Sequence, residues 1–249
     1  MKQSSLIGGI AAMAGGCSLL LGASLAPAAY RGATYAYGIN NAGDVSGSFF
    51  GPAVGQFFTH GFVESAEVYT NTTPVLPAFP EATTQETDNF FGLNDSGDVA
   101  GYFIDNVSDT YHGFVESGGV YTTLTDPAAT YGTVALGINN ADNVVGTFYD
   151  ASGQYGFFES GGIYTTLTVP GAIATVASGI NDTGEVAGTF EDASGEDHGF
   201  VESGGIYTIL DDPAAFPGMT FAEGINDAGD VAGFFGGASG YQGFVATPI

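Results

Sequence analysis

Acidic and amide side chains recur together in a decapeptide that the chain carries in five copies. The copies are GINNAGDVSG, GLNDSGDVAG, GINNADNVVG, GINDTGEVAG and GINDAGDVAG, and they begin at Gly38, Gly92, Gly137, Gly179 and Gly224. Oxygen-rich loops of this kind can bind Ca²⁺, which takes about six to eight oxygen ligands. The acids in these loops are Asp44, Asp98, Asp142, Glu185 and Asp230. The amides that precede them are Asn40, Asn94, Asn139, Asn181 and Asn226.

A tight turn without a metal accounts for the same residues. An Asn or Asp side chain can cap its own backbone, and a Gly in the turn adopts a left-handed conformation. Asp142 stands where the other copies have Gly, and Asp is among the few other residues that tolerate this conformation. Each copy offers only one or two carboxylates, fewer than a good calcium loop. The decapeptide therefore predicts hairpin turns and no metal or cofactor, with calcium binding as the alternative.

A second recurring block, HGFVES or a variant of it, follows each decapeptide. Its first residue carries a hydrogen-bonding side chain in every copy: His60, His112, Tyr155, His198 and Gln242. Zinc needs its nitrogen ligands within about 2.1 Å of one ion, and equivalent positions of different repeats are expected to lie apart. We expect a structural role, with the ring hydrogen-bonded at the start of a strand. A repeated sugar or peptide contact is the alternative, and it makes these five positions the ligand-binding candidates.

Four short strands are expected in each repeat, because apolar and β-branched segments alternate with Gly-rich turns. Gly-Gly before the fourth segment suits a type I′ hairpin, in which both central residues need positive φ. The G-[IL]-N triplets are 54, 45, 42 and 45 residues apart, and periods of about 40–50 residues are typical of propeller blades. The predicted fold is all-β: a five-bladed β-propeller of four-stranded repeats, the last ending after its third strand. A linear β-solenoid and a pair of sandwiches are the alternatives.

A Phe recurs near the end of the predicted second strand, where we expect it to pack between blades rather than to form a platform for a ligand. The five copies are Phe49, Phe103, Phe148, Phe190 and Phe235.

The first 28 residues have the features of a cleaved export signal. Lys2 supplies a positive charge, residues 6–25 are uncharged and largely apolar, and Ala26-Pro27-Ala28 offers a cleavage site. A transmembrane anchor and lipidation at Cys17 are the alternatives. We expect residues 29–249 to form a single propeller domain that is secreted, extracellular or periplasmic. Its repeats are predicted at about 35–75, 88–128, 133–169, 174–212 and 219–249.

The paired motifs G-I-N-x-x-G-x-V-x-G and H-G-F resemble those of the HAF-type bacterial extracellular repeat family. The resemblance covers residues 35–249 and departs from the family pattern at Tyr155, Gln242 and Asp142. It implies an exported repeat protein with a propeller fold. It brings no known reaction and no settled ligand, so no functional residue is carried over from it.

The formal net charge is −25, and the only basic residues besides His are Lys2 and Arg31. This charge disfavours nucleic acid and anionic membrane surfaces as partners. The repeats are near-equal, whereas a glycosidase site needs carboxylates with different roles, and no G-x-S-x-G, Walker or dinucleotide motif occurs. The sequence therefore predicts a non-enzymatic, multivalent binding or surface-interaction module for neutral glycans or a cell-surface component. A structural or matrix protein is the first alternative, and a propeller glycoside hydrolase is the second.

Overall fold

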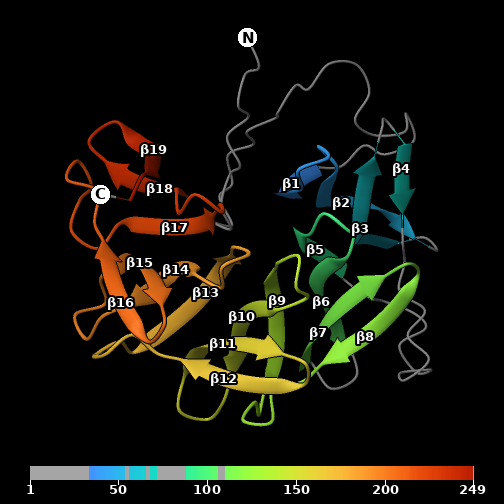
Figure 1. The fold of residues 1–249 in the computed structure, drawn as a ribbon, viewed down its shortest axis with the longest axis horizontal. Helices are drawn as coiled ribbons and strands as arrows, with labels where there is room; N and C mark the ends of the chain where they lie inside the picture. Colours follow the sequence, from blue (N-terminus) through green and yellow to red (C-terminus); the bar gives the residue numbers. More distant parts are fainter. Residues whose placement is uncertain (1–33, 54–55, 66–67, 72–87, 106–109, 249) are drawn as a thin grey trace.

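The computed structural model describes residues 34–53, 56–65, 68–71, 88–105 and 110–248 (Figure 1). The predicted signal with Cys17 lies outside the described residues, and so does most of the Pro-rich linker of the first repeat, at 72–87. In the described residues, no helix is long and apolar enough to cross a membrane.

Nineteen strands and no helix are found in the described part of the chain. In chain order they are β1 (Thr34–Ile39), β2 (Val45–Ala53), β3 (Gln56–Ser65), β4 (Val68–Asn71), β5 (Asp88–Leu93), β6 (Val99–Asp105), β7 (Thr110–Ser117), β8 (Val120–Leu124), β9 (Gly132–Ile138), β10 (Val144–Tyr149), β11 (Gln154–Ser160), β12 (Ile163–Leu167), β13 (Ala174–Ile180), β14 (Val186–Glu191), β15 (Asp197–Ser203), β16 (Ile206–Leu210), β17 (Thr220–Ile225), β18 (Val231–Gly237) and β19 (Gly240–Ala246). The all-β prediction is confirmed.

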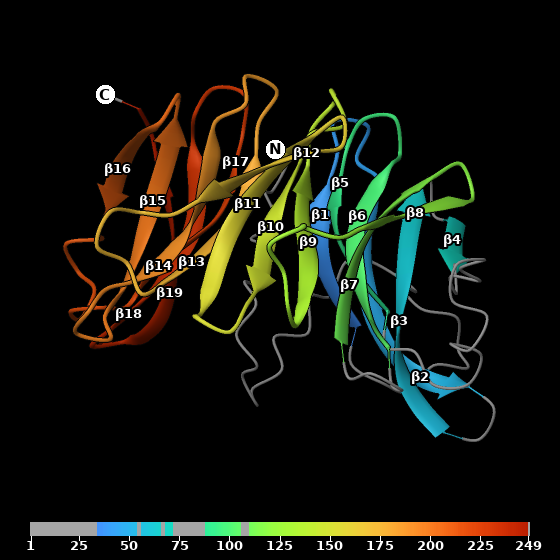
Figure 2. The ribbon, with the colours of Figure 1, turned by 90° about the horizontal axis from the view of Figure 1, so that it is seen from below.

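The strands pair antiparallel in successive groups, which we call units one to five: β1–β4, β5–β8, β9–β12, β13–β16 and β17–β19. Units two to four join into one sheet through short parallel pairings of β7 with β9 and of β11 with β13. Units one and five form separate sheets, so the sheets do not close. Unit five has three strands, as the sequence predicts. The units follow one another round an arc whose ends are β1 and β17, with each unit's first strand on the inside (Figures 1 and 2).

Local turn signals in the sequence correspond to the turns of the structure. Gly118 and Gly119 between β7 and β8 have φ values of 57° and 86°, as a type I′ turn requires, and the Gly-Gly pairs of units three and four match them. In the decapeptide turn, Asp142 has a φ of 59°, which confirms that it takes the left-handed place of Gly. Each first strand also carries a register shift at or just before the Gly of its G-[IL]-N triplet, typical of a β-bulge.

The hydrophobic core lies between neighbouring units. One buried cluster joins Ala100 and Leu124 of unit two to Phe148 and Phe157 of unit three. The next cluster joins Val145 of unit three to residues of unit four, including Phe190. The recurrent Phe therefore packs between units, as predicted, at Phe148 and Phe190. Because each unit covers only part of its own apolar surface, its stability depends on the neighbouring unit.

The Gly of the G-[IL]-N triplet marks a close approach between the first strands of neighbouring units. A Cβ atom on Gly92 would lie 2.8 Å from the backbone nitrogen of Ile138 and 2.9 Å from Cα of Gly137. Likewise, a Cβ atom on Gly179 would lie 2.9 Å from Cα of Gly224. Gly224 itself, at the end of the arc, has nothing within 4 Å of such an atom. This Gly is therefore required only where another unit follows.

We predict that Gly92→Ala lowers the free energy of unfolding by roughly 1–3 kcal/mol, because the added methyl group must displace backbone. Gly224→Ala is the matched control, since it places the same methyl group in open space and is expected to change stability by less than about 0.5 kcal/mol. Urea denaturation of both variants checks this. Equal destabilisation by the two substitutions would show that unit five also has a close neighbour at its first strand.

Candidate functional site

The Asn of each triplet forms the decapeptide turn through its side-chain oxygen. In unit three, Oδ1 of Asn139 accepts hydrogen bonds from the backbone N–H groups of Ala141 at 3.1 Å and Asn143 at 3.0 Å. Asn94, Asn181 and Asn226 make the same pair of bonds in their turns, and Asn40 makes the second of them. The decapeptide therefore forms a turn capped by its own Asn.

The same Asn side chains also link neighbouring units through their nitrogen atoms. Nδ2 of Asn139 donates to the backbone oxygen of Asn181 at 3.0 Å, and Nδ2 of Asn94 donates to the oxygen of Asn139 at 3.3 Å. Asn40 and Asn181 bond in the same way to Asn94 and Asn226. Asn94, Asn139 and Asn181 are each only 3% exposed. The Asn residues thus form a ladder from unit one to unit five that is buried in units two to four.

A second ladder follows from the residue after this Asn, which is Asn or Asp in every copy. Its members are Asn41, Asp95, Asn140, Asp182 and Asp227. The backbone N–H of Asn41 donates to Oδ1 of Asp95 at 2.8 Å, and that of Asp182 donates to Oδ1 of Asp227 at 2.8 Å. Asn140 connects both sides, because its Nδ2 donates to Oδ2 of Asp95 at 3.0 Å and to Oδ2 of Asp182 at 2.7 Å. This position has no recognisable motif of its own in the sequence. Its restriction to Asn and Asp was the available signal.

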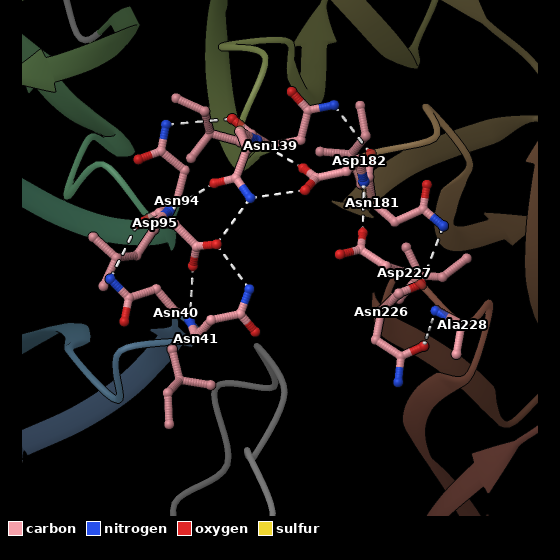
Figure 3. A pocket seen from close by; sticks show the side chains of 16 residues that line it. Asn40, Asn41, Asn94, Asp95, Asn139, Asn181, Asp182, Asn226, Asp227 and Ala228 are labelled. Atoms are coloured by element: carbon pink, nitrogen blue, oxygen red, sulfur yellow. Dashed lines mark hydrogen bonds between the residues drawn. The ribbon is translucent and has the colours of Figure 1, made fainter.

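The two ladders surround a cavity of about 370 Å³, which we call the central cavity. Figure 3 shows the Asn and Asp side chains of successive units side by side around it, linked by the hydrogen bonds described above. Aliphatic side chains of the same triplets complete its lining: Ile39, Leu93, Ile138, Ile180 and Ile225. Every unit therefore contributes one Ile or Leu and two polar side chains to a single shared site.

The central cavity is negatively charged and holds amide donors beside its carboxylates. Asp95, Asp182 and Asp227 contribute the charge, and the described residues contain no Lys or Arg. Hydrogen bonds from the backbone and then the side chain of Asn41, together with the Asn140 amide, hold the pKa of Asp95 below its ordinary value. Asp95 therefore stays ionised and accepts hydrogen bonds only.

The five predicted calcium candidates lie at the turns and not in a shared cluster. Four of them accept a hydrogen bond from the Asn of their own turn, as Asp44 does from Asn40 at 3.0 Å. Asp142 instead accepts one from Asn94 of the preceding unit at 3.1 Å. Within the described residues, none of the five belongs to a group of three or more metal-ligating side chains. Calcium binding stays a prediction.

The five ligand-binding candidates lie on the third strands of different units, each opposite the recurrent Phe of the second strand. Three of them stack on that Phe, with ring centroids 5.0 Å apart for His112, 5.4 Å for Tyr155 and 5.1 Å for His198, and the His60 ring is tilted against Phe49 at 5.2 Å. Gln242 pairs with Phe235 in the same register. The structure does not bring these five residues together. The four rings pack against the recurrent Phe. Both the structural role and ligand contact at these positions stay predictions.

No protein-family model and no curated protein sequence matches the chain. Among solved structures, it is similar to AofleA from Arthrobotrys oligospora, with a TM-score of 0.53 and 12% identity over 87% of this chain and 72% of that one. A fucose-specific lectin from Aleuria aurantia gives a TM-score of 0.48 at 12% identity, covering 87% and 78% of the two chains. The β-propeller domain of the Trilobed protease from Pyrococcus furiosus gives 0.41 at 8% identity, covering 85% and 92%. The likeness to AofleA is one of fold alone.

We predict that Asn139→Ala costs roughly 1–3 kcal/mol more stability than Asn226→Ala. Both substitutions remove the two bonds that the side-chain oxygen makes within the turn. Only the first also leaves the buried backbone oxygen of Asn181 without its inter-unit donor. Chemical denaturation of the two variants measures the difference. Equal losses would mean that the ladder adds nothing to the coupling between units.

Glu223 in unit five makes the stability of the protein depend on pH. Glu223 lies at the bulge of β17. The residues at the equivalent position of units one, two and three are Tyr37, Phe91 and Leu136, and these three side chains pack in one apolar cluster. Burial raises the pKa of Glu223 to about 7, from an ordinary value of 4.5. Its stabilising contribution is therefore complete below about pH 4.5 and is lost as the pH rises through about 7.

Glu223→Gln is expected to remove this loss. At about pH 8 the variant should be more stable than the wild type by roughly 1–3 kcal/mol, and at about pH 4 the two should be nearly equal. Thermal unfolding at both pH values checks this. A stability difference that is the same at both pH values would contradict the proton linkage.

Proposed function

We propose that the protein is an exported, non-enzymatic carbohydrate-binding module whose neutral glycan ligand binds in the central cavity. We also propose that its units are the blades of a five-bladed propeller with a three-stranded last blade. The likeness to AofleA and the arc of units with their first strands inside support this architecture. The composition of residues 1–28 supports export.

The observation that carries the ligand class is the mixed lining of the central cavity. Its volume of about 370 Å³ falls within the usual size of small-molecule sites, about 300–1,000 Å³. Sugar hydroxyl groups donate and accept hydrogen bonds, and the carboxylates of Asp182 and Asp227 accept while the Asn amides do both. The Ile and Leu side chains offer aliphatic surface to the C–H faces of a sugar ring. A neutral ligand avoids the repulsion that an anion would meet from the three carboxylates.

The repeats bind the ligand together, in one composite site. Each repeat supplies two polar side chains to the central cavity, so the repeats together build one site with several equivalent contacts. A separate sugar contact at His60, His112, Tyr155, His198 and Gln242 is a further form of the same proposal. In that form, additional sugar molecules bind on the outside of the arc.

A non-enzymatic role agrees with the state of the cavity acids. Glycoside hydrolysis needs a carboxylic acid with a raised pKa beside a second, ionised carboxylate. Hydrogen bonds hold the pKa of Asp95 below its ordinary value, which is the opposite of what a general acid requires. Asp95, Asp182 and Asp227 also occupy equivalent motif positions, whereas the two carboxylates of a glycosidase have different roles.

Calorimetry with the purified protein tests the proposal, using a glycan array to choose the sugars. We expect saturable binding of a neutral sugar that Asp227→Asn weakens by roughly tenfold, the loss of one charge-assisted hydrogen bond. Asp227 is a suitable target because its Oδ1 accepts the Asp182 N–H, which Asn can also do.

The matched control is Asp212→Asn, which removes one charge from a turn outside the cavity, where Asp212 accepts the Ala214 N–H. It should bind sugar as the wild type does. Absence of binding to any sugar on the array, with and without Ca²⁺, would reject the carbohydrate proposal and favour the structural alternative.

A further inference from the structure

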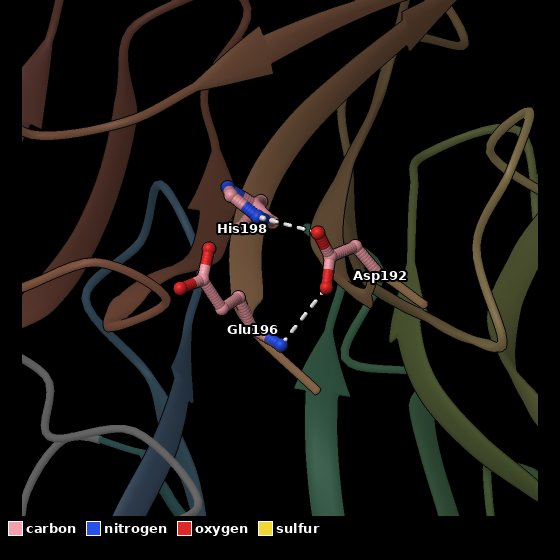
Figure 4. A group of neighbouring side chains, drawn as sticks. All are labelled: Asp192, Glu196 and His198. Carbon is pink, nitrogen blue, oxygen red and sulfur yellow. Dashed lines mark hydrogen bonds and ion pairs between the residues drawn. The ribbon is translucent and has the colours of Figure 1, made fainter. Parts of the chain in front are cut away.

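A cluster of three potential metal ligands lies at the turn between β14 and β15 of unit four. It comprises Asp192, Glu196 and His198, whose ligand atoms all lie within 4.8 Å of one another. Figure 4 shows a nitrogen of the His198 ring directed at the Asp192 carboxylate, with the Glu196 carboxylate beside the His198 ring on the side away from Asp192. The cluster is separate from the central cavity, which it does not line.

The turn backbone fixes the Asp192 carboxylate. Its Oδ1 accepts hydrogen bonds from the backbone N–H groups of Ser194 at 2.7 Å and Glu196 at 3.0 Å. Its Oδ2 is directed toward Nε2 of His198, at 3.8 Å. One oxygen therefore anchors the side chain, and the other is available to a ligand.

Two contacts fix the His198 ring. Its Nδ1 lies 2.8 Å from Oδ1 of Asp211, and its ring stacks on Phe190 with centroids 5.1 Å apart. When Nδ1–H donates to Asp211, the lone pair of Nε2 faces Oδ2 of Asp192, so that two acceptors point at each other. A carboxylate that orients a His in this way is the usual outer partner of a metal-bound imidazole.

The separation of the two acceptors suits a shared ion. Atoms 3.8 Å apart are too far for a hydrogen bond. Two ligands of one tetrahedral zinc ion, each about 2.0–2.1 Å from it, are separated by about 3.3 Å. A small rotation of the Asp192 or His198 side chain would bring both within reach of one ion.

Unit three provides an internal comparison, because the same turn lacks the ligands. Oδ1 of Asp150 accepts from the N–H groups of Ser152 at 2.6 Å and Gly153 at 3.0 Å, as Asp192 does in unit four. The strand register places Tyr155 opposite Phe148, where unit four pairs His198 with Phe190. The unit-four turn is one residue longer, and that residue lies at Glu196. A carboxylate and an imidazole are thus added to a turn that forms without them.

We propose that Asp192, Glu196 and His198 form a site for a divalent transition-metal ion of the zinc class, with Asp211 as the residue that orients the His198 ring. Imidazole nitrogen with carboxylate oxygen suits zinc and its neighbours, whereas calcium and magnesium prefer oxygen ligands alone. Three protein ligands leave at least one coordination position, which water or an oxygen of a bound molecule fills. This site is independent of sugar binding in the central cavity.

The rival arrangement is a protonated His198 held between Asp192 and Asp211 by charge alone. It predicts no specific metal binding. It also predicts that zinc and calcium bind the chain equally weakly, as they would to scattered carboxylates.

Titration of the untagged, metal-free full chain with ZnCl₂ and with CaCl₂, followed by calorimetry, distinguishes the two. We expect one saturable zinc site that about 1 mM calcium does not displace. His198→Tyr introduces the residue of unit three, which keeps a ring on Phe190, and should weaken zinc binding by at least roughly tenfold. Asp192→Asn, which keeps the turn acceptor, should do the same.

Asp150→Asn is the matched control in unit three and should leave zinc affinity unchanged. Circular dichroism and thermal unfolding establish that each variant is folded. Cobalt(II) substitution adds a spectroscopic check, since its absorption bands report ligand number and should be lost in His198→Tyr. The proposal is overturned if zinc does not saturate, if His198→Tyr binds it like the wild type, or if calcium competes equally.

Discussion

The structure depends on the close approach of the first strands of neighbouring units. At Gly92 and Gly179 the backbone of the next unit lies 2.8–2.9 Å from where a Cβ atom would be, closer than a Cβ atom tolerates. This contact brings the Asn ladder within hydrogen-bonding distance and positions the apolar clusters that each unit shares with its neighbour. A single unit has neither a complete core nor satisfied Asn side chains, so the units must fold against each other.

The central cavity is a consequence of that contact. Because the triplets lie side by side, the residue after each Asn is brought next to its counterpart, and five exposed turns become one lined site. The alternation of Asn and Asp in units one to four then matters. Asn140 can donate to a carboxylate on each side, at Asp95 and Asp182, whereas a ladder of Asp alone would have only repulsion between its side chains.

Local features of the fold could be predicted from the sequence, and the hydrogen bonds between units could not. The Gly-Gly turns and the left-handed Asp142 follow from conformational rules that act within a few residues. The Asn of each triplet has a sufficient local explanation as a turn residue, so nothing in the sequence called for its second bond to the next unit. The position after it was overlooked for the same reason, since its partner lies about 45 residues away. The stacking of His112 on Phe103 likewise needs the strand register.

The positions at which the repeats differ indicate a binding site that the shared positions do not. The turn between the second and third strands forms in units three and four from the same Asp-capped backbone, with Asp150 and Asp192 in the same role. Since Asp150 forms its turn without an acid or an imidazole nearby, the turn does not need Glu196 or His198 for its stability. Glu196 also adds a negative charge beside Asp192, which costs stability unless a cation or proton offsets it. The extra residue in unit four is therefore better explained by ligand binding than by a role in forming the turn.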